Sequence, residues 1–210
     1  MNKWSKRFIG IGLLCLLAAL CLTAYNLWSD AHAGKAADRV LQQLNRLEGD
    51  SAQDTHAAEE IPDYILNPRM DMPTQKIDGQ NYIGTLQIEA LELSLPVISE
   101  WSYSRLQIAP CRYAGSVYMD NMVIAAHNYT SHFGRLKELS QGDAVTFTDI
   151  DGNIFRYRVT EIETLQPYSV KEMTSGDWDL TLFTCTIGGR TRVTVRCERV
   201  TDANIAAAPD

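Results

Sequence analysis

The longest apolar run in the chain lies close to its N-terminus. It begins at Phe8 and continues, with only two polar interruptions, to Trp28. This gives about 21 residues, roughly enough to cross a bilayer. Three basic residues precede the run, so the positive-inside rule keeps this end in the cytoplasm. The sequence predicts a cytoplasmic tip and transmembrane signal anchor over residues 1–29, with the span at 8–28, in a single-pass protein of the cell membrane whose working part is extracytoplasmic.

A cleaved signal peptide is the alternative interpretation of this segment. Ala31-His32-Ala33 has the small-x-small pattern of a cleavage site. The apolar run is longer than the ~7–15 residues of a typical signal core, which favours an uncleaved anchor. Both interpretations place the rest of the chain outside the cytoplasm.

A short amphipathic helix is predicted directly after the anchor. Its apolar residues recur at helical spacing at Ala37, Val40, Leu41, Leu44 and Leu47. Gly49 is a suitable end for this helix, and residues 49–60 are small and polar, as in a flexible linker. We therefore expect a helical stalk and linker over residues 30–60 and a folded domain that starts at residue 61.

From there the apolar residues follow a period of two. Residues 91–97 alternate between apolar and polar, which is typical of a strand with one buried face, and Pro96 indicates a sheet edge or strand end. Asp151-Gly152 lies between two such runs and is a strong hairpin signal. Similar runs occur at residues 82–88, 122–126, 144–149, 155–162, 180–184 and 192–200, and short helical patterns at 133–139 and 169–172. Seven or eight strands predict a barrel or a sandwich over residues 61–204, followed by a C-terminal tail at 205–210.

Composition and charge narrow the range of functions. With 45% hydrophobic and 21% charged residues, the chain has the composition of a globular protein. Its net charge is −7, but without the basic first 29 residues 16 Lys and Arg face 26 Asp and Glu, a net of −10. A domain of that sign repels a phosphate backbone, so we expect no nucleic-acid partner.

Five cysteines need an explanation in an exported protein. Cys15 and Cys21 lie inside the apolar anchor, which leaves three in the outer domain. An odd number in an oxidising compartment indicates at least one free thiol. Cys185 ends an apolar run before a glycine-containing loop, and the arginines that follow it favour the nucleophilic thiolate form. A buried strand-end cysteine with solvated arginines is the alternative, and it is the commoner case for a cysteine taken alone. Cys197 lies on one strand face and is interpreted as core or disulfide-bonded, and a bridge from it to Cys111 stays open.

A thiol nucleophile needs a partner that accepts and donates protons, and histidine is the usual one. Two of the four histidines lie in the predicted stalk and linker. His127 ends the apolar run 122–126 and is the better candidate, whereas His132 is interpreted as a loop or helix-cap residue. Their spacing matches no standard metal site, so we expect no metal and no cofactor.

These residues resemble the sortases, which are membrane-anchored cysteine transpeptidases of Gram-positive bacteria. The family's Thr-Leu-x-Thr-Cys motif is matched by residues 181–185, an arginine leads into the next strand, and Ala126-His127-Asn128 lies upstream. The family usually has glycine before the histidine, where this chain has alanine. The resemblance covers residues 82–200 and implies a mainly β fold, a single closed eight-stranded sortase-type barrel with a few short helices.

The resemblance also implies the roles of the candidate catalytic residues. Cys185 would attack the substrate carbonyl and form a thioacyl-enzyme. His127 would protonate the leaving amine and later accept a proton from the incoming amine. Arg192, which leads directly into the last strand, would hydrogen-bond the developing oxyanion, and Arg190 is the alternative arginine.

The implied substrate is the C-terminal sorting signal of an exported protein, similar to Leu-Pro-x-Thr-Gly or Asn-Pro-x-Thr-x. An amine from a peptidoglycan precursor or a pilin would then resolve the intermediate and join the protein to the cell wall or to a fibre. Thr184, Ala126 and Asn128 adjoin the candidate catalytic residues, and we expect them to bind the substrate.

The sequence is compatible with two sortase classes and with two other functions. Asn67-Pro68 and Asn128 favour a class B-like sortase, whereas the lack of a long helical pattern between Tyr168 and Leu180 favours a class D-like one. A cell-wall cysteine peptidase would use the same residues but transfer the acyl group to water. A membrane-tethered β domain that only binds its ligands would keep Cys185 for structure.

Overall fold

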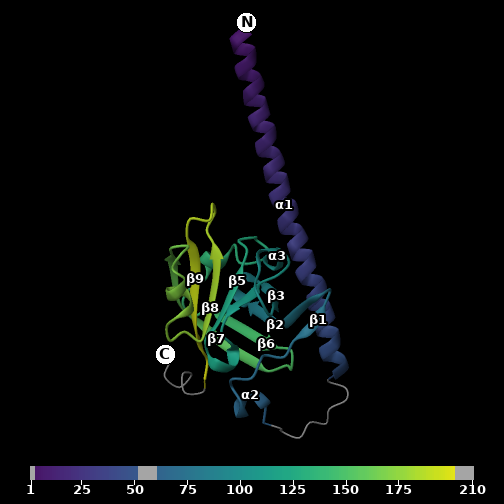
Figure 1. Ribbon diagram of the computed structural model, residues 1–210, viewed down its shortest axis with the longest axis vertical. Helices are drawn as coiled ribbons and strands as arrows, with labels where there is room; N and C mark the ends of the chain where they lie inside the picture. Colours follow the sequence, from purple (N-terminus) through teal and green to yellow (C-terminus); the bar gives the residue numbers. More distant parts are fainter. Residues whose placement is uncertain (1–2, 52–60, 202–210) are drawn as a thin grey trace.

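The computed structural model describes residues 3–51 and 61–201, and it consists of a β-barrel with one long helix along its side (Figure 1). Most of the predicted linker, residues 52–60, and the predicted tail at 205–210 lie outside the described residues. The strands are β1 Gln75–Ile77, β2 Gln80–Ile88, β3 Leu93–Ile98, β4 Cys111–Ala114, β5 Met122–Ala126, β6 Ala144–Asp149, β7 Ile154–Leu165, β8 Leu180–Cys185 and β9 Arg192–Arg199.

Eight of these strands form a closed ring. The order β2-β3-β4-β5-β8-β9-β7-β6 returns to its start because β6 also pairs with β2, while β1 pairs with the first residues of β2. β5–β8 and β3–β4 are parallel and the other pairs are antiparallel. The predicted closed eight-stranded barrel is therefore confirmed, with β1 added to it and β4 not foreseen.

Two glycines serve the closure and its neighbouring hairpin. Gly84 lies where β2 meets β6, and a Cβ there would lie 2.1 Å from the carbonyl oxygen of Thr148. Gly152, with φ of +82°, turns the predicted β6–β7 hairpin. The carboxylate of Asp149 accepts the backbone N–H groups of Asp151 and Asn153 in the same turn. Both positions show why the chain has glycine there, since a side chain would clash or strain the backbone.

Alternating strand residues fill the barrel. In β6 and in the first half of β7, residues 154–159, every second side chain is buried, as the period of two predicts. The largest fully buried side chains include Tyr157, Phe133, Phe147, Phe155, Leu86 and Ile124. The helices are short apart from α1: α2 Asp63–Leu66, α3 Tyr103–Leu106 and α4 Val170–Thr174, with 3-10 turns η1 Glu89–Leu91, η2 Val117–Met119 and η3 Leu136–Glu138.

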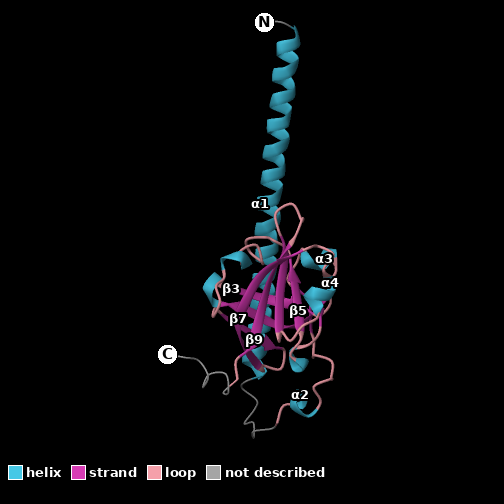
Figure 2. Ribbon diagram, turned by 90° about the vertical axis from the view of Figure 1, so that its left-hand side faces the viewer, coloured by secondary structure: helices cyan, strands magenta, loops and turns pink. Residues whose placement is uncertain are grey.

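The helix α1, Lys3–Ser51, joins the predicted anchor and stalk into one continuous element. Its N-terminal half projects beyond the barrel, and its C-terminal half runs along the barrel wall (Figures 1 and 2). Four of its residues are buried against the barrel: Ala33, Ala37, Val40 and Leu44. Leu41 is half-buried, and the side chain of Leu47 lies outside the described part of the structure. The stalk therefore differs from a free-standing spacer, because its apolar stripe packs on the folded domain.

Strand β3 is one of the parts of the barrel that α1 contacts. Strand β3 meets β4 only at Ile98 and Cys111, so most of one edge of β3 has no strand partner. Pro96 lies in this segment, as expected for a residue without an N–H, and α1 lies against the strand. The prediction of a sheet edge at Pro96 is confirmed, and α1 covers it.

Candidate active site

The strand register brings the ends of β5 and β8 to one rim of the barrel. Ala126, the last residue of β5, pairs in parallel with Thr184, and β8 ends one residue later at Cys185. His127 follows Ala126, so His127 and Cys185 occupy equivalent positions on neighbouring chains. Because neighbouring strands lie about 5 Å apart, this register brings the backbone of His127 and the backbone of Cys185 close together at the rim.

Arg192 completes this group from the other neighbour of β8. It begins β9 and is the antiparallel partner of Cys185. Directly opposite residues on antiparallel strands point their side chains to the same face. The structure therefore places the three predicted catalytic residues, which are far apart in the sequence, on three adjacent strand ends.

The arginines after Cys185 have different surroundings. Arg192 is half-buried, and its guanidinium donates to the carbonyl oxygens of Gly189 and Thr191, at 3.1 Å each. Arg190 is exposed in the β8–β9 loop. Arg196 is buried, where it forms a 2.8 Å ion pair with Glu163 and donates to the carbonyl oxygen of Met173, which holds α4 on the barrel. The register therefore favours Arg192 as the arginine beside the thiol.

The three cysteines of the barrel differ in accessibility. All are free thiols, and only Cys185 is half-buried rather than buried. Burial raises the pKa of Cys111 to about 12 and also raises the pKa of Cys197. A thiol that stays protonated and sealed from solvent is a poor nucleophile. Cys185 is therefore the barrel cysteine whose position suits nucleophilic chemistry.

His127 lies at the start of a tight loop. Its carbonyl oxygen accepts the N–H of Phe133 at 3.2 Å, which closes the loop on itself. The imidazole lies beside the ring of Tyr129, with 5.0 Å between ring centroids. Burial lowers the pKa of His127, so the neutral imidazole predominates at pH 7.

Thr184 and Ala126 are placed differently from the expectation that they bind the substrate. Both are buried, at 3% and 5% exposure, and the hydroxyl of Thr184 donates to the carbonyl oxygen of Ala126 at 2.8 Å. This bond fastens β5 to β8 immediately before the two candidate catalytic residues. Thr184 and Ala126 therefore hold the ends of β5 and β8 together and do not face a substrate. Asn128, in contrast, is exposed and accessible to a substrate.

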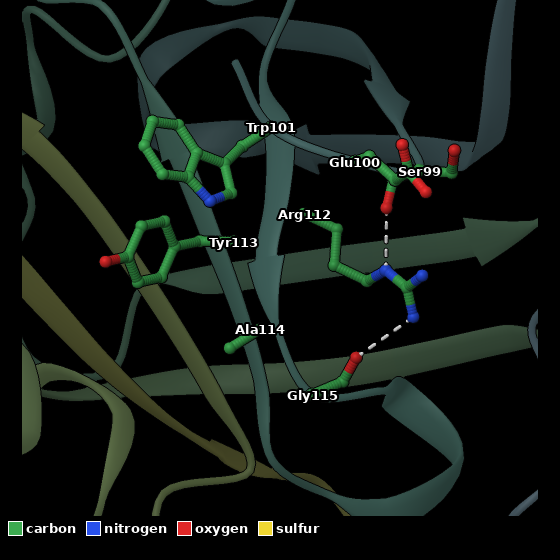
Figure 3. Close-up of a pocket in the computed structure, with 7 residues that line it drawn as sticks. All are labelled: Ser99, Glu100, Trp101, Arg112, Tyr113, Ala114 and Gly115. Atoms are coloured by element: carbon green, nitrogen blue, oxygen red, sulfur yellow. Dashed lines mark hydrogen bonds between the residues drawn. The ribbon is translucent and has the colours of Figure 1, made fainter. Parts of the chain in front are cut away.

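An aromatic surface leads away from Cys185 and was not found in the sequence. Phe183 shares the face of Cys185 on β8, and the ring of Tyr113 on β4 meets it edge-on at 5.3 Å. Trp101 follows at 5.3 Å from Tyr113. Figure 3 shows these two rings on one side of β4 and Arg112 on the other, where it donates to the carbonyl oxygens of Ser99 and Gly115. Trp101 and Tyr113 help to line a pocket of about 360 Å³.

His132 lies close to the candidate site but cannot reach a substrate. Its side chain has no exposed surface, and neither ring nitrogen has a hydrogen-bond partner among the described residues. Burial, together with the nearby His127, lowers its pKa to about 4 from the ordinary 6.5. The interpretation of His132 as a loop residue outside the chemistry fits this environment.

The burial of His132 predicts a pH-dependent stability. The unfolded chain binds a proton at this residue below pH 6.5 and the folded chain does not until about pH 4, so stability is lost as pH falls through that window. Through this one residue, the free energy of unfolding should be about 2–3 kcal/mol lower at pH 4.5 than at neutral pH. Denaturant unfolding of the full chain in mild detergent at pH 7.5 and 4.5 measures it. His132→Leu, of similar volume, should flatten the dependence, and an unchanged slope in this variant would contradict the assignment.

The described residues contain no group of three or more His, Cys, Asp and Glu side chains that is arranged to hold a metal ion. A closed barrel with a half-buried thiol, an imidazole and a guanidinium on adjacent strand ends has the layout of an enzyme that transfers acyl groups through cysteine.

Comparison with protein families assigns this layout to a known group. The family model "Sortase domain" matches residues 86–200, which is more than half of the chain. The chain belongs to the sortase family, a family of cysteine transpeptidases. A search of the curated proteins found no match.

Solved sortases share the fold. A Clostridium perfringens sortase D5 transpeptidase has a TM-score of 0.55 at 18% identity, covering 81% of this chain and 99% of that one. Sortase C1 from Streptococcus agalactiae has a TM-score of 0.54 at 21% identity, covering 79% and 90%. Streptococcus pneumoniae sortase C has a TM-score of 0.53 at 24% identity, covering 77% and 88%. At these identities the likeness concerns the barrel architecture.

Proposed function

We propose that this chain cleaves a C-terminal sorting signal of exported proteins through Cys185 and transfers the acyl group to an amine of the cell wall or of a pilin. The observation that carries the proposal is the register of β5, β8 and β9. Ala126, directly before His127, pairs with Thr184, directly before the half-buried Cys185, and Arg192 pairs with Cys185, which supports a site made of these three residues. Family membership supports the reaction class, and the geometry supports these three residues as its agents.

The reaction divides into two acyl transfers. In the first, the sulfur of Cys185 attacks the carbonyl carbon of the threonine-type residue, and the oxyanion is hydrogen-bonded by Arg192. The C–N bond then breaks, His127 gives its proton to the leaving amine, and a thioester remains. In the second, an amine attacks the thioester, His127 accepts its proton, the C–S bond breaks, and a new amide forms. Cys185 leaves as a thiolate and takes the proton back from His127, which restores the thiol and the neutral imidazole.

The resting protonation follows from the environment of His127. Burial lowers the pKa of its imidazole, so the neutral form predominates at pH 7. Transfer of the proton from Cys185 to His127 creates both the nucleophile and the acid that the first step needs.

The aromatic surface beside Cys185 is the proposed path of the substrate. Phe183, Tyr113 and Trp101 form successive ring contacts that lead from the thiol's strand to the pocket at Ser99–Gly115. Apolar and proline-containing peptides pack well on exposed aromatic faces. We place the residues upstream of the scissile bond on Trp101 and Tyr113, the accessible rings of this surface, because Phe183 is buried.

We also propose that the chain stays anchored through α1. This helix is long and apolar enough to cross a membrane, and its apolar window has no surface buried in the protein. The alternative cleavage site at Ala31-His32-Ala33 lies inside the continuous helix, where Ala33 packs on the barrel at 1% exposure. A peptidase would have to unwind this packed segment, which favours the uncleaved, extracytoplasmic orientation.

Between the two subclasses, we infer a class D-like arrangement. The connection between β7 and β8, where a class B-like enzyme would have a long helical insertion, contains only the five-residue α4 among its helices. Arg196 holds α4 in position by donating to the carbonyl oxygens of Glu172 and Met173.

The test of the proposed function is a ligation assay with the full chain in detergent micelles, because α1 is part of the fold. Sorting peptides of the Leu-Pro-x-Thr-Gly and Asn-Pro-x-Thr-x types are incubated with and without an amine. Amine-dependent ligation supports the transpeptidase, and hydrolysis indifferent to amine would indicate a cysteine peptidase instead. A full panel without cleavage would favour a binding domain.

Replacement of Arg192 separates the two candidate arginines. Arg192→Ala should lower kcat by about 10²–10³-fold, as loss of one oxyanion donor does in other enzymes. Arg190→Ala is the matched control, since Arg190 lies exposed in the loop, and it should leave kcat close to that of the parent chain. Steady-state kinetics of amine-dependent transfer measures both, and the opposite ranking would reassign the oxyanion donor to Arg190.

A further inference from the structure

The loop that carries His127 is held by a carboxylate of the membrane helix. Oδ2 of Asp30 accepts the backbone N–H of Thr130, and Oδ1 accepts the backbone N–H of Ser131, at 3.0 Å each. The hydroxyl of Ser131 also donates to Oδ1, at 2.5 Å. Three donors of one turn thus converge on a single side chain about 100 residues away in the sequence.

The two residues flanking this contact reinforce it. The hydroxyl of Ser29 lies 3.0 Å from the hydroxyl of Tyr129, whose ring packs beside the imidazole of His127. One helical turn beyond Asp30, a Cβ on Gly34 would lie 3.1 Å from Cβ of Ser131, so the glycine allows the close approach of helix and loop. Packing and hydrogen bonds therefore act at the same place.

Backbone hydrogen bonds connect the turn held by Asp30 to His127. The carbonyl oxygen of Tyr129 accepts the N–H groups of His132 and Gly134, at 2.9 Å each, and the carbonyl oxygen of His127 accepts the N–H of Phe133. The turn bound by Asp30 is thus linked by backbone hydrogen bonds to His127, the residue with the proposed catalytic imidazole.

We propose that Asp30 is a positioning residue for catalysis: the carboxylate that emerges at the end of the membrane span fixes the 127–134 loop, and through it the imidazole of His127 relative to Cys185. This inference rests on the proposed function and adds to it a role for α1 beyond anchoring. The barrel is locked to the membrane helix at the rim that carries the candidate site, and the β8–β9 loop points toward the same end as the N-terminal half of α1 (Figure 1).

The test uses the full chain in detergent micelles with two readouts. Asp30→Ala should lower kcat for peptide transfer by about ten- to a hundredfold with little change in KM, because a displaced imidazole slows proton transfer without altering the peptide surface. Backbone hydrogen exchange at Thr130 and Ser131 should accelerate in the same variant, since their N–H groups lose their acceptor. Asp38→Ala, at an exposed position of the same helix, is the control and should change neither.

Asp30→Asn provides a second variant that keeps one acceptor oxygen and the shape of the side chain. It should give an intermediate loss of kcat, whereas a purely structural helix contact would move the melting temperature and leave kcat at saturation unchanged. Faster exchange with unchanged kcat in both variants, or unchanged exchange, would overturn the proposal. A parent chain that transfers no peptide would overturn the proposed function and the catalytic role together, while hydrogen exchange would still report on the anchor.

Discussion

Replacement of Cys185 with alanine should abolish peptide transfer. The variant lacks the sulfur that forms the thioester, and no other barrel cysteine can substitute, because Cys111 and Cys197 are buried and burial raises the pKa of each. The half-buried position at a strand end means that loss of one sulfur leaves the barrel core unchanged. Product formation by mass spectrometry and a thermal melt of the same sample measure both expectations.

Cys111→Ala is the matched control for this experiment. It removes a buried sulfur from a packed hydrophobic cluster, so it should lower the melting temperature. It should retain peptide transfer, because Cys111 is not one of the candidate catalytic residues. The two variants should therefore show opposite patterns of activity and stability. Retained turnover in Cys185→Ala would remove this residue as the nucleophile.

Replacement of His127 with alanine should lower kcat by about 10²–10⁴-fold, the range expected for loss of a general acid and base. The leaving amine cannot depart without a proton, and His127 is the imidazole on the strand end adjacent to Cys185. The deficit should shrink with a thioester substrate, since a thiolate leaves without protonation. Steady-state kinetics with a peptide and a thioester of the same sequence measure the difference.

His132→Leu controls for the loss of an imidazole in the same loop. His132 has no exposed surface, so its replacement should affect stability and leave kcat within a few fold of the parent chain. A larger loss of kcat in this variant than in His127→Ala would exchange the roles of the two histidines. An equal loss with peptide and thioester would contradict proton donation to the leaving group.

Most strands of the barrel could be predicted from the sequence, as could the candidate histidine, cysteine and arginine. Strand β6 and the first half of β7 carry a clear period of two, and the hairpin at Asp151-Gly152 has a specific turn signal. Strand β1 has three residues and β4 has four, too few for a period to be recognised, and β4 includes an irregular register with β5. Closure of the ring depends on β2–β6 pairing across more than fifty residues, for which the family resemblance was the only guide.

The details around the candidate site depended on contacts that no local pattern encodes. Thr184 and Ala126 adjoin the catalytic candidates in sequence, yet strand alternation turns their side chains away and uses the Thr184 hydroxyl to bridge two strands. Asp30 is the first acidic residue after the apolar span, but its partners lie about 100 residues away. Only the packing of α1 on the barrel brings them together, so the predicted stalk gave no sign of this role.

The formation of a thioester on Cys185 tests the central claim most directly. The full chain is incubated with a sorting peptide in the absence of amine, denatured in acid, digested and analysed by mass spectrometry. We expect the acyl part of the peptide to be attached to the fragment containing Cys185, and hydroxylamine to release it. Attachment to a different residue, or cleavage of the peptide with no acyl adduct in any fragment of the rapidly quenched chain, would contradict it.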